Sequence, residues 1–341
     1  MVEIKTLKHI DAIEQLTDLY VFTFNHKVTT EFWKWKYVDN PLSAELPGVI
    51  VALDGSKIIG ARPFLLNELW LGDKKIVAAQ HCDTMVHKDY RGQGIFNRMG
   101  KYALNYLAEH NCSLSFGFPG PMSRKGFASQ GYRKIMDTEI LFHITNPVNV
   151  IKSKLKKDRL DFDDYHVEVS ERYTAEMNIL DSFRKRNIID IVRSEENLRW
   201  RFDNNPLRSY RYILIKKEGL LLGYAIISMQ KLLTWGNIGI IIDYLIKDDN
   251  INCFRAIVSK SLEEFNRYAC PVSAIWTLGE PVLHKVLTEN FGFKSSIKFP
   301  YRKFMDSGYM DLIVNDDKIA DKINIYDQAS WRVTYAYPNY T

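Results

Sequence analysis

Apolar residues follow two different spacings along the first part of the chain, and each spacing predicts one kind of secondary structure. Between residues 10 and 24 they recur every three or four positions, as on one face of an α-helix, whereas short apolar runs bounded by turn residues are typical of strands. In chain order, the predicted elements are a helix at 10–24, strands at 48–53, 57–64 and 76–86, a helix at 95–107, a strand at 113–119, a short helix at 127–132 and a strand at 137–144. This order predicts an α/β domain with a mixed sheet that begins with an antiparallel hairpin.

A second feature of the pattern is an internal repeat. Residues 31–42 read EFWKWKYVDNPL and match residues 196–207, which read ENLRWRFDNNPL. A predicted hairpin follows both segments, and the strand that ends at Val86 has a counterpart that ends at Ile246. The chain is therefore predicted to be a tandem duplication with one α/β domain in each copy.

The two copies differ at the turn that follows this strand. In the first copy the turn reads Arg91-Gly92-Gln93-Gly94 and leads into the predicted helix at Ile95. Glycines let backbone N–H groups approach a phosphate closely, and the helix start adds its dipole. In the second copy, residues 248–252 have no glycine and carry two extra carboxylates, which would repel a pyrophosphate. We therefore expect only the first copy to bind a pyrophosphate-bearing ligand.

Other phosphate-binding motifs fit this turn poorly. A dinucleotide fingerprint needs a third glycine where Asn97 stands, and an acidic residue about twenty positions further on. A P-loop needs Lys and then Ser or Thr after its last glycine, where this chain has Ile95. An ordinary glycine-containing turn stays open as the alternative.

The turn and the elements around it resemble motif A of the GNAT superfamily of acetyl-CoA-dependent N-acyltransferases. That motif reads Arg or Gln, two residues, Gly, one residue, then Gly or Ala, and this chain departs from it with Phe96 at the last position. One complete and one degenerate copy is an arrangement similar to that of tandem GNAT proteins. The resemblance implies two GNAT-like domains and acetyl-CoA as co-substrate. It implies cofactor contacts from Met85, Val86, Arg91, Gly92, Gln93, Gly94, Ile95 and Phe96, the first two through backbone N–H groups.

The predicted domain limits follow from the repeat and from a charged segment between the copies. The first domain spans residues 1–147 and binds acetyl-CoA, residues 148–165 form a linker, and the degenerate domain spans 166–305. The tail at 306–341 has no counterpart in the repeat. Within it, residues 331–337 alternate like a final strand.

Two side chains on the strand at 76–86 are candidates for the base that deprotonates an acceptor amine. Strand alternation places His81, Asp83 and Met85 on one face and Cys82 on the other. Because a carboxylate in a dry cleft can have its pKa raised towards neutrality, Asp83 is the first candidate and His81 the second. A structural hydrogen bond is the alternative for both residues, and Asp243 at the corresponding position of the second copy favours that alternative for Asp83.

The resemblance also implies a tyrosine that protonates the leaving thiolate, at the position where this chain has Phe127. Tyr132, Ser123 or solvent would take its place. Since an unperturbed thiol has a pKa of about 8.5, a thiolate can also leave without an acid.

Trp33 is a candidate contact for the acceptor, because the second copy has Leu198 at the matching position. The alternative is a packing role for the aromatic residues of the repeated segment. We favour packing, since both copies carry the segment and only one carries the glycine turn.

Composition indicates the cellular compartment and the classes of partner that we expect. A length of 341 residues with 46% hydrophobic content supports two domains with their own cores. The net charge of +5 is modest and the basic run at 152–159 is followed by acidic residues, so neither nucleic acid nor a membrane is an expected partner. No apolar stretch approaches the roughly eighteen residues that span a bilayer. The four cysteines form no metal-ligand spacing and no disulfide-dense pattern, so we expect a cytoplasmic protein without a metal.

The sequence thus predicts an N-acyltransferase that moves an acetyl group from acetyl-CoA to a primary amine of a small molecule, such as an amino sugar or an aminoglycoside-like compound. A non-catalytic sensor or scaffold that binds acyl-CoA is the alternative, because the glycine turn predicts the cofactor rather than the chemistry.

Overall fold

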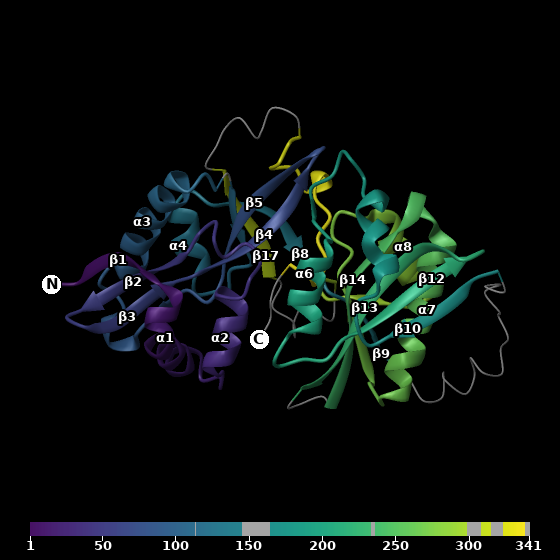
Figure 1. Cartoon of the computed structure of the whole chain (residues 1–341), viewed down its shortest axis with the longest axis horizontal. Coiled ribbons are helices and arrows are strands. Elements are labelled where there is room, and N and C mark those ends of the chain that lie inside the picture. The colour runs from purple at the N-terminus through teal and green to yellow at the C-terminus, as the bar shows by residue number, and fades with distance from the viewer. Residues whose placement is uncertain (113, 145–163, 233–235, 299–307, 315–322, 338–341) are drawn as a thin grey trace. The chain divides into compact units, whose positions relative to one another are not determined.

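The structure is a computed structural model that describes residues 1–112, 114–144, 164–232, 236–298, 308–314 and 323–337 (Figure 1). The chain forms two compact units. The first comprises Met1–Asp137, Asn204–Leu207 and Gly308–Ser330, and the second comprises Thr138–Asp203, Arg208–Ser307 and Trp331–Thr341. Each unit is therefore assembled from separate stretches of the sequence.

The first unit contains the elements predicted up to residue 132 in the predicted order, and further elements are present in addition. Its elements are β1 (Glu3–Lys8), α1 (His9–Phe24), α2 (Thr30–Tyr37), β2 (Gly48–Asp54), β3 (Lys57–Arg62), β4 (Phe64–Leu71), β5 (Lys74–His81), β6 (Met85–Val86), a 3-10 turn (Lys88–Tyr90), α3 (Ile95–Glu109), β7 (Leu114–Gly117), α4 (Arg124–Ser129), β8 (Arg133–Thr138), β17 (Gly308–Val314) and a 3-10 turn (Gln328–Ser330). Of these, β1, α2, β4, β8 and β17 are additional to the predicted elements. One sheet has the order β1-β2-β3-β6, and in the other β4, β5, β7, β17 and β8 are neighbours in that order.

Helix α3 covers β2 and β3 with the apolar face that its sequence predicts. Met99, Ala103 and Leu107 on that face are fully buried and pack on strand residues such as Ile50 and Ile59. Burying one large apolar side chain contributes about 1.5–3 kcal/mol to stability, so this face holds the start of α3 firmly against the sheet.

The predicted strand at 76–86 is wrong in its middle, where the chain leaves one sheet and joins the other. Strand β5 pairs with β7 in parallel up to His81 opposite Gly117, whereas Met85 in β6 pairs with Ala61 in β3. Between them Asp83 has a left-handed φ of 49°. Simple alternation therefore fails at residues 82–84, and the expected common face of His81, Asp83 and Met85 does not exist.

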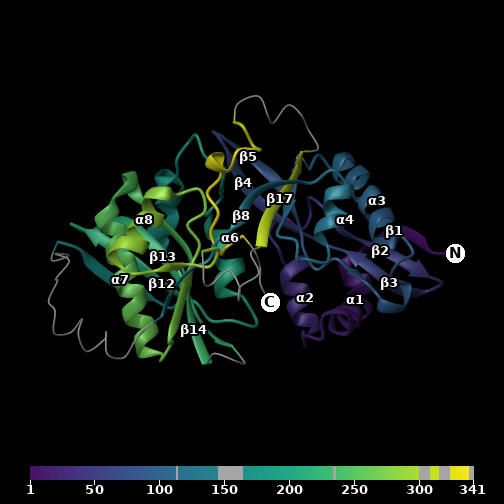
Figure 2. The ribbon, with the colours of Figure 1, turned by 180° about the vertical axis from the view of Figure 1, so that it is seen from behind.

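Each half of the sequence contributes a strand to the sheet of the other unit. Strand β9 (Leu141–Ile144), predicted to close the first domain, pairs with β15 (Val272–Ile275) and β16 (Lys294–Ser295) in the second unit. Strand β17 lies in the predicted tail and pairs with β7 in the first unit, as the yellow strand among the blue ones in Figure 2 shows. The domain limits predicted at residues 147 and 306 thus assign β9 and β17 to the wrong domains. Strand propensity predicts that a segment is extended, but it does not specify the strand with which the segment pairs.

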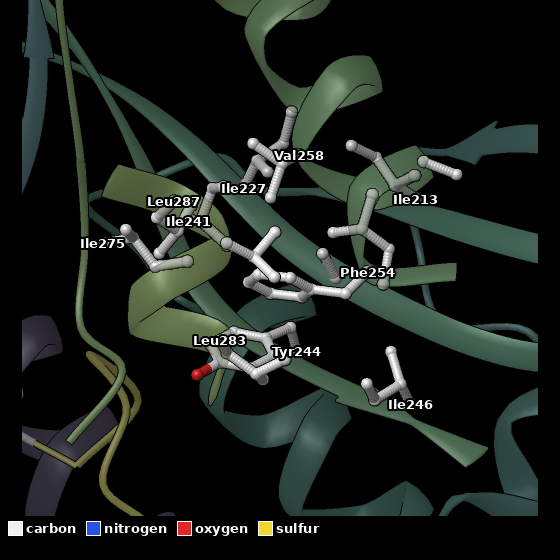
Figure 3. Close-up of a cluster of buried hydrophobic side chains, with 14 of the residues drawn as sticks. Ile213, Ile227, Ile241, Tyr244, Ile246, Phe254, Val258, Ile275, Leu283 and Leu287 are labelled. Atoms are coloured by element: carbon white, nitrogen blue, oxygen red, sulfur yellow. The ribbon is translucent and has the colours of Figure 1, made fainter. Parts of the chain in front are cut away.

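The second unit repeats the strand and helix order of the first. Its further elements are β10 (His166–Ser170), a 3-10 helix (Ala175–Phe183), β11 (Asp190–Ile191), α6 (Glu195–Leu198), a π-helical turn (Arg199–Asp203), β12 (Arg211–Lys217), β13 (Leu220–Leu232), β14 (Gly236–Ile246), a 3-10 turn (Lys247–Asp249), α7 (Ile251–Arg267) and α8 (Pro281–Asn290). The sheet order is β10-β12-β13-β14-β15-β9-β16. Figure 3 shows one buried face of this sheet, where Phe254 of α7 packs among Ile213, Ile227 and Ile241.

Two predictions for the ends of this unit have different outcomes. Most of the predicted linker at 148–165 lies outside the described residues. The predicted final strand at 331–337 is wrong: this segment makes isolated bridges, Trp331 with Ile189 and Val333 with Leu278. In the part of the chain that the structure describes, no helix has the length and apolar character needed to cross a bilayer.

Candidate active site

A cavity of about 730 Å³ lies in the first unit where β5, β6, α3 and α4 meet. Its lining residues come from four stretches: Thr23 and Phe24; His81, Cys82, Asp83, Thr84 and Val86; Tyr90, Arg91, Gly92, Gly94, Ile95, Phe96 and Asn97; and Phe118, Pro119, Gly120, Pro121, Met122, Ser123, Gly126 and Phe127. The cavity therefore opens at the place where β5 leaves its partner β7. Its volume is within the usual range for small-molecule sites.

The glycine turn forms one wall of this cavity. Gly92 and Gly94 have left-handed φ values of 78° and 71°, which side chains with a Cβ rarely adopt. Gly94 is the N-cap of α3 and offers no side-chain hydrogen bond, so the first N–H groups of the helix are left for a ligand. Arg91 lies beside them, and its Nε donates to the carbonyl oxygen of Val86 at 3.2 Å.

Six of the eight predicted cofactor contacts line the cavity. They are Val86, Arg91, Gly92, Gly94, Ile95 and Phe96. Gln93 is not among the lining residues, and the side chain of Met85 is fully buried in the core. Any contribution of Met85 to the site would therefore come from its backbone.

Phe96 packs on the cavity wall rather than across the glycine turn. Its ring meets that of Phe127 edge-on at 5.2 Å. It also covers Gly126, where an added Cβ would lie 2.4 Å from the Phe96 ring. The aromatic residue that departs from the family pattern thus leaves the space next to Gly92 and Gly94 open.

Asp83 reaches the cavity but is already paired. Its Oδ2 accepts hydrogen bonds from Lys36 Nζ at 2.6 Å and from the Tyr37 hydroxyl. Burial lowers the pKa of Lys36, but the charges of Asp83 and Cys82 and the hydrogen bond to Asp83 together outweigh this effect, so the pKa lies above its ordinary value. Asp83 therefore neutralises a fully buried cation, a structural role that makes it a poor base.

His81 lies at the end of β5 and is 4% exposed. Its Nε2 is 2.7 Å from Oδ1 of Asp311 on β17, and its ring stacks on Phe127 with centroids 3.8 Å apart. Burial lowers the pKa of His81, although Asp311 acts in the opposite direction. The imidazole therefore favours its neutral form, which is the form that can accept a proton.

The candidate acids differ in their access to the cavity. The Tyr132 hydroxyl is buried between Ser115 Oγ at 2.9 Å and Arg62 Nη2 at 3.2 Å, and burial raises the pKa of Tyr132. Tyr132 is not among the cavity-lining residues, whereas Ser123 is. The Ser123 hydroxyl donates to the carbonyl oxygen of Gly120 at 3.1 Å.

Trp33 lies in the core and not on the cavity wall. It is 1% exposed, and its indole N–H donates to Nδ1 of His9 at 3.3 Å. Burial lowers the pKa of His9 to about 3, so this ring is a neutral acceptor. The position of Trp33 agrees with the packing role of the repeated segment.

Residues 3–135 match the family model described as an acetyltransferase (GNAT) domain. The chain carries a GNAT domain. No curated protein matches the sequence. The family comparison supports acyl transfer as the general activity.

Solved GNAT structures extend the likeness to the second unit. A GCN5-related N-acetyltransferase from Anabaena variabilis is 14% identical, with a TM-score of 0.68 over 93% of this chain and 74% of that one. A GCN5-related N-acetyltransferase from Kribbella flavida is 9% identical, with a TM-score of 0.64 over 94% and 72%. A tandem GNAT protein from the clavulanic acid biosynthesis pathway is 12% identical, with a TM-score of 0.56 over 92% and 99%. The tandem GNAT fold predicted from the repeat is thereby confirmed.

Sequence reasoning missed three residues at or next to the GNAT cavity. Lys36 lies in the repeated segment, where Arg201 at the matching position was a signal for a buried cation. Arg62 is fully buried among aromatic rings. It stands at the end of an apolar strand, and nothing in the sequence indicated that its charge would be buried. Asp311 lies in a segment without a counterpart in the repeat, so nothing in the sequence connected it with His81. Among the described residues, no group of three or more His, Cys, Asp or Glu side chains could hold a metal ion.

Proposed function

We propose that the first unit is an acetyl-CoA-dependent N-acyltransferase that acts on a primary amine of a small molecule. The observation that carries this proposal is one continuous cavity with the uncapped start of α3 on one wall and His81 on another. A site with anion-binding N–H groups and a neutral imidazole has the two functions that the reaction requires.

The glycine turn is the part of the cavity suited to the pyrophosphate. The N–H groups at the start of α3 and the charge of Arg91 would hold its oxygens, while the positive φ of Gly92 and Gly94 keeps side chains away from them. The part of the cavity between the glycine turn and His81 would then hold the pantetheine arm.

The chemistry is direct attack of the amine nitrogen on the thioester carbonyl, with a new N–C bond formed and the C–S bond broken. His81 would take the proton that the nitrogen loses, because Asp83 is occupied by Lys36 and Tyr37. With Phe127 at the usual tyrosine position and Tyr132 away from the cavity, the thiolate would leave unprotonated or take a proton from solvent.

The walls of the cavity favour a particular kind of acceptor. Aromatic and apolar side chains, such as Phe24, Phe118 and Met122, line much of it, and Asp83 is the one carboxylate among its lining residues. Since Lys36 neutralises that carboxylate, the walls offer little to a molecule with several positive charges. Among amines, those with one amino group on an apolar or aromatic body should therefore react better than aminoglycosides.

The test is isothermal titration with acetyl-CoA followed by a thiol-release screen of amines. We expect binding that is lost in Arg91→Glu and kept in Lys101→Glu, a control on an exposed face of α3 with the same charge change. Thiol release with at least one amine supports the enzyme. Binding with no release on a panel that includes apolar amines, amino sugars and aminoglycosides favours the acyl-CoA sensor, and absence of binding by the wild type contradicts both functions.

A further inference from the structure

The base proposed above has a partner from a distant part of the chain. Strand β17 places Asp311 directly opposite Gly117 of β7, the residue that also pairs with His81 of β5. Since Gly117 has no side chain, the His81 ring lies across it, where an added Cβ would be 2.0 Å from His81 Cε1. The gap left by Gly117 thus lets His81 reach Asp311 across β7.

The side chains of His81 and Asp311 are in direct contact and almost completely buried. His81 Nε2 and Asp311 Oδ1 are 2.7 Å apart, and their side chains are 3% and 2% exposed. Oδ2 of Asp311 has no hydrogen-bond partner among the described residues. A buried carboxylate is costly without a donor, so His81 is the group that supplies one.

This bond decides which nitrogen of His81 carries the proton. Because a carboxylate only accepts, the neutral imidazole must place its hydrogen on Nε2 and keep the lone pair on Nδ1. Phe127 stacks on the ring and fixes its plane. His81 lines the cavity, so Nδ1 is the ring nitrogen left to accept a proton from a bound molecule.

Other charged and titratable groups around His81 leave this arrangement intact. Arg62 of β3 faces it and opposes protonation, whereas Asp311 favours protonation. The Tyr132 ring meets the His81 ring edge-on at 5.0 Å, and the Tyr132 hydroxyl is bound to Ser115 and Arg62. Cys82 and Asp83 follow His81 in the chain and are bound to Tyr37.

We infer that Asp311 is a positioning residue that holds His81 as the Nε2–H tautomer and stabilises the imidazolium formed when Nδ1 takes the proton of the acceptor amine. The inference rests on the proposed function. In the same step the N–C bond forms, the C–S bond breaks and the electron pair leaves with the thiolate. The proton then passes from Nδ1 to solvent, and His81 returns to its starting tautomer.

The first experiment determines the tautomer without any substrate. Nuclear magnetic resonance of histidine-labelled protein, with the His81 signals assigned from their loss in His81→Asn, should show the Nε2–H form. In Asp311→Asn the pKa of His81 should fall further, because the carboxylate that favours the charged form is gone. A wild-type Nδ1–H tautomer, or an unchanged pKa in the variant, would overturn the inference. The wild-type spectrum decides the matter even if Asp311→Asn does not fold.

The second experiment asks whether the pair serves turnover. In Asp311→Asn we expect kcat to fall about 10²-fold, within the range for general base catalysis, with little change in the Kd for acetyl-CoA. The acid limb of kcat/KM should move to lower pH along with the pKa of His81. Leu312→Ala, at the next and fully buried position of β17, is the control: it should lower thermal stability and leave the acid limb in place. If the limb stays in place in Asp311→Asn, the inference fails.

Failure of the inference and failure of the proposed function give different results. If no amine is acetylated but the tautomer and the pKa shift are found, the acyltransferase proposal fails and the arrangement of His81 and Asp311 stands. If an amine is acetylated with an unshifted limb, the enzyme stands and another group is the base.

Discussion

Helix α3 of the first unit and the corresponding helix α7 of the second begin in opposite ways, and this difference separates a candidate binding site from a closed surface. In the first unit Gly94 leaves the start of α3 uncapped beside a cavity of about 730 Å³. In the second unit the side chain of Asn250 caps α7 by accepting from the Cys253 N–H at 3.0 Å. Lys185 pairs with Asp249 next to a void of about 10 Å³, room for one water molecule. The same strand-turn-helix frame therefore has N–H groups available to an anionic ligand only in the first unit.

The matching carboxylates Asp83 and Asp243 extend this comparison. Asp83 is 14% exposed on its side chain and pairs with Lys36. Asp243 is 1% exposed and accepts from Arg193 at 2.9 Å and from Thr334 at 2.8 Å. Burial raises the pKa of Asp243, but the charges of Arg193 and Arg332 and the hydrogen bonds to the carboxylate together outweigh this effect, so the pKa lies below its ordinary value. Both carboxylates compensate a buried cation, which favours the structural role for Asp83 as well.

The C-terminal segment closes the second unit at the place where the first has its cavity. The guanidinium of Arg332 lies between Asp190 at 3.2 Å and Glu280 at 3.1 Å. The next residue, Val333, donates its N–H to the carbonyl oxygen of Leu278 at 3.1 Å. Chain atoms thus fill the gap that follows the paired part of β14 and β15, and a ligand cannot enter there.

The largest expected effect comes from removing Arg193, one of the buried cations of the second unit. Arg193→Met leaves Asp243 buried without an ion-pair partner among the described residues and leaves Asp190 with Arg332 alone, which should cost about 3–5 kcal/mol in the free energy of unfolding. Lys36→Met should cost less, about 1–3 kcal/mol, because Asp83 can reach water in the cavity. Urea unfolding of both variants checks the order. Equal losses would show that the two carboxylates have the same environment.

Replacing a glycine of the turn by valine should distinguish an effect of backbone strain on stability from an effect on ligand binding. Gly94→Val and Gly219→Val both force a branched side chain into a left-handed backbone, with φ values of 71° and 78°, at a cost of about 1–3 kcal/mol. Only Gly94→Val should weaken acetyl-CoA binding, by about 100-fold or more, since each tenfold corresponds to about 1.4 kcal/mol. Isothermal titration of the two variants measures this. A similar loss of binding in both would mean that the turn acts only through stability.

A smaller effect, sensitive to pH, should distinguish the buried His9 of the first unit from the exposed His166 of the second. His9 has a pKa of about 3 in the folded protein against 6.5 ordinarily, so the unfolded chain takes up its proton first as the pH falls. Its contribution to stability is complete above pH 6.5 and should fall by about 2 kcal/mol by pH 5.

His9→Phe should remove this part of the acid sensitivity, whereas His166→Phe, at an exposed position of the second unit, should not. Urea unfolding at pH 7 and pH 5 compares the variants with the wild type. The assignment is wrong if the wild type and His9→Phe lose equal stability between these two pH values.

Local patterns in the chain were enough to predict many elements of the first unit, the duplication and the glycine turn. Helical and strand spacing, the hairpin between the strands at 48–53 and 57–64, and the Arg91 to Gly94 turn are local patterns, because backbone conformation there depends on neighbouring residues. The repeat at residues 31–42 and 196–207 likewise needed no coordinates. These features sufficed to predict the tandem GNAT fold and most of the residues on one wall of the cavity.

The exchange of strands between the two units and the pairing of buried charged side chains could be established only from the tertiary structure. The break at residues 82–84 follows from a change of sheet, the pairing of Asp83 depends on Lys36 in α2, and His81 meets a carboxylate 230 positions away. Contacts of this kind leave no trace in local periodicity, since they depend on strand order and on a gap at Gly117. The residues that could bind a pyrophosphate could therefore be predicted from the sequence. The partner of the proposed base could be identified only from the arrangement of the strands in the folded sheets.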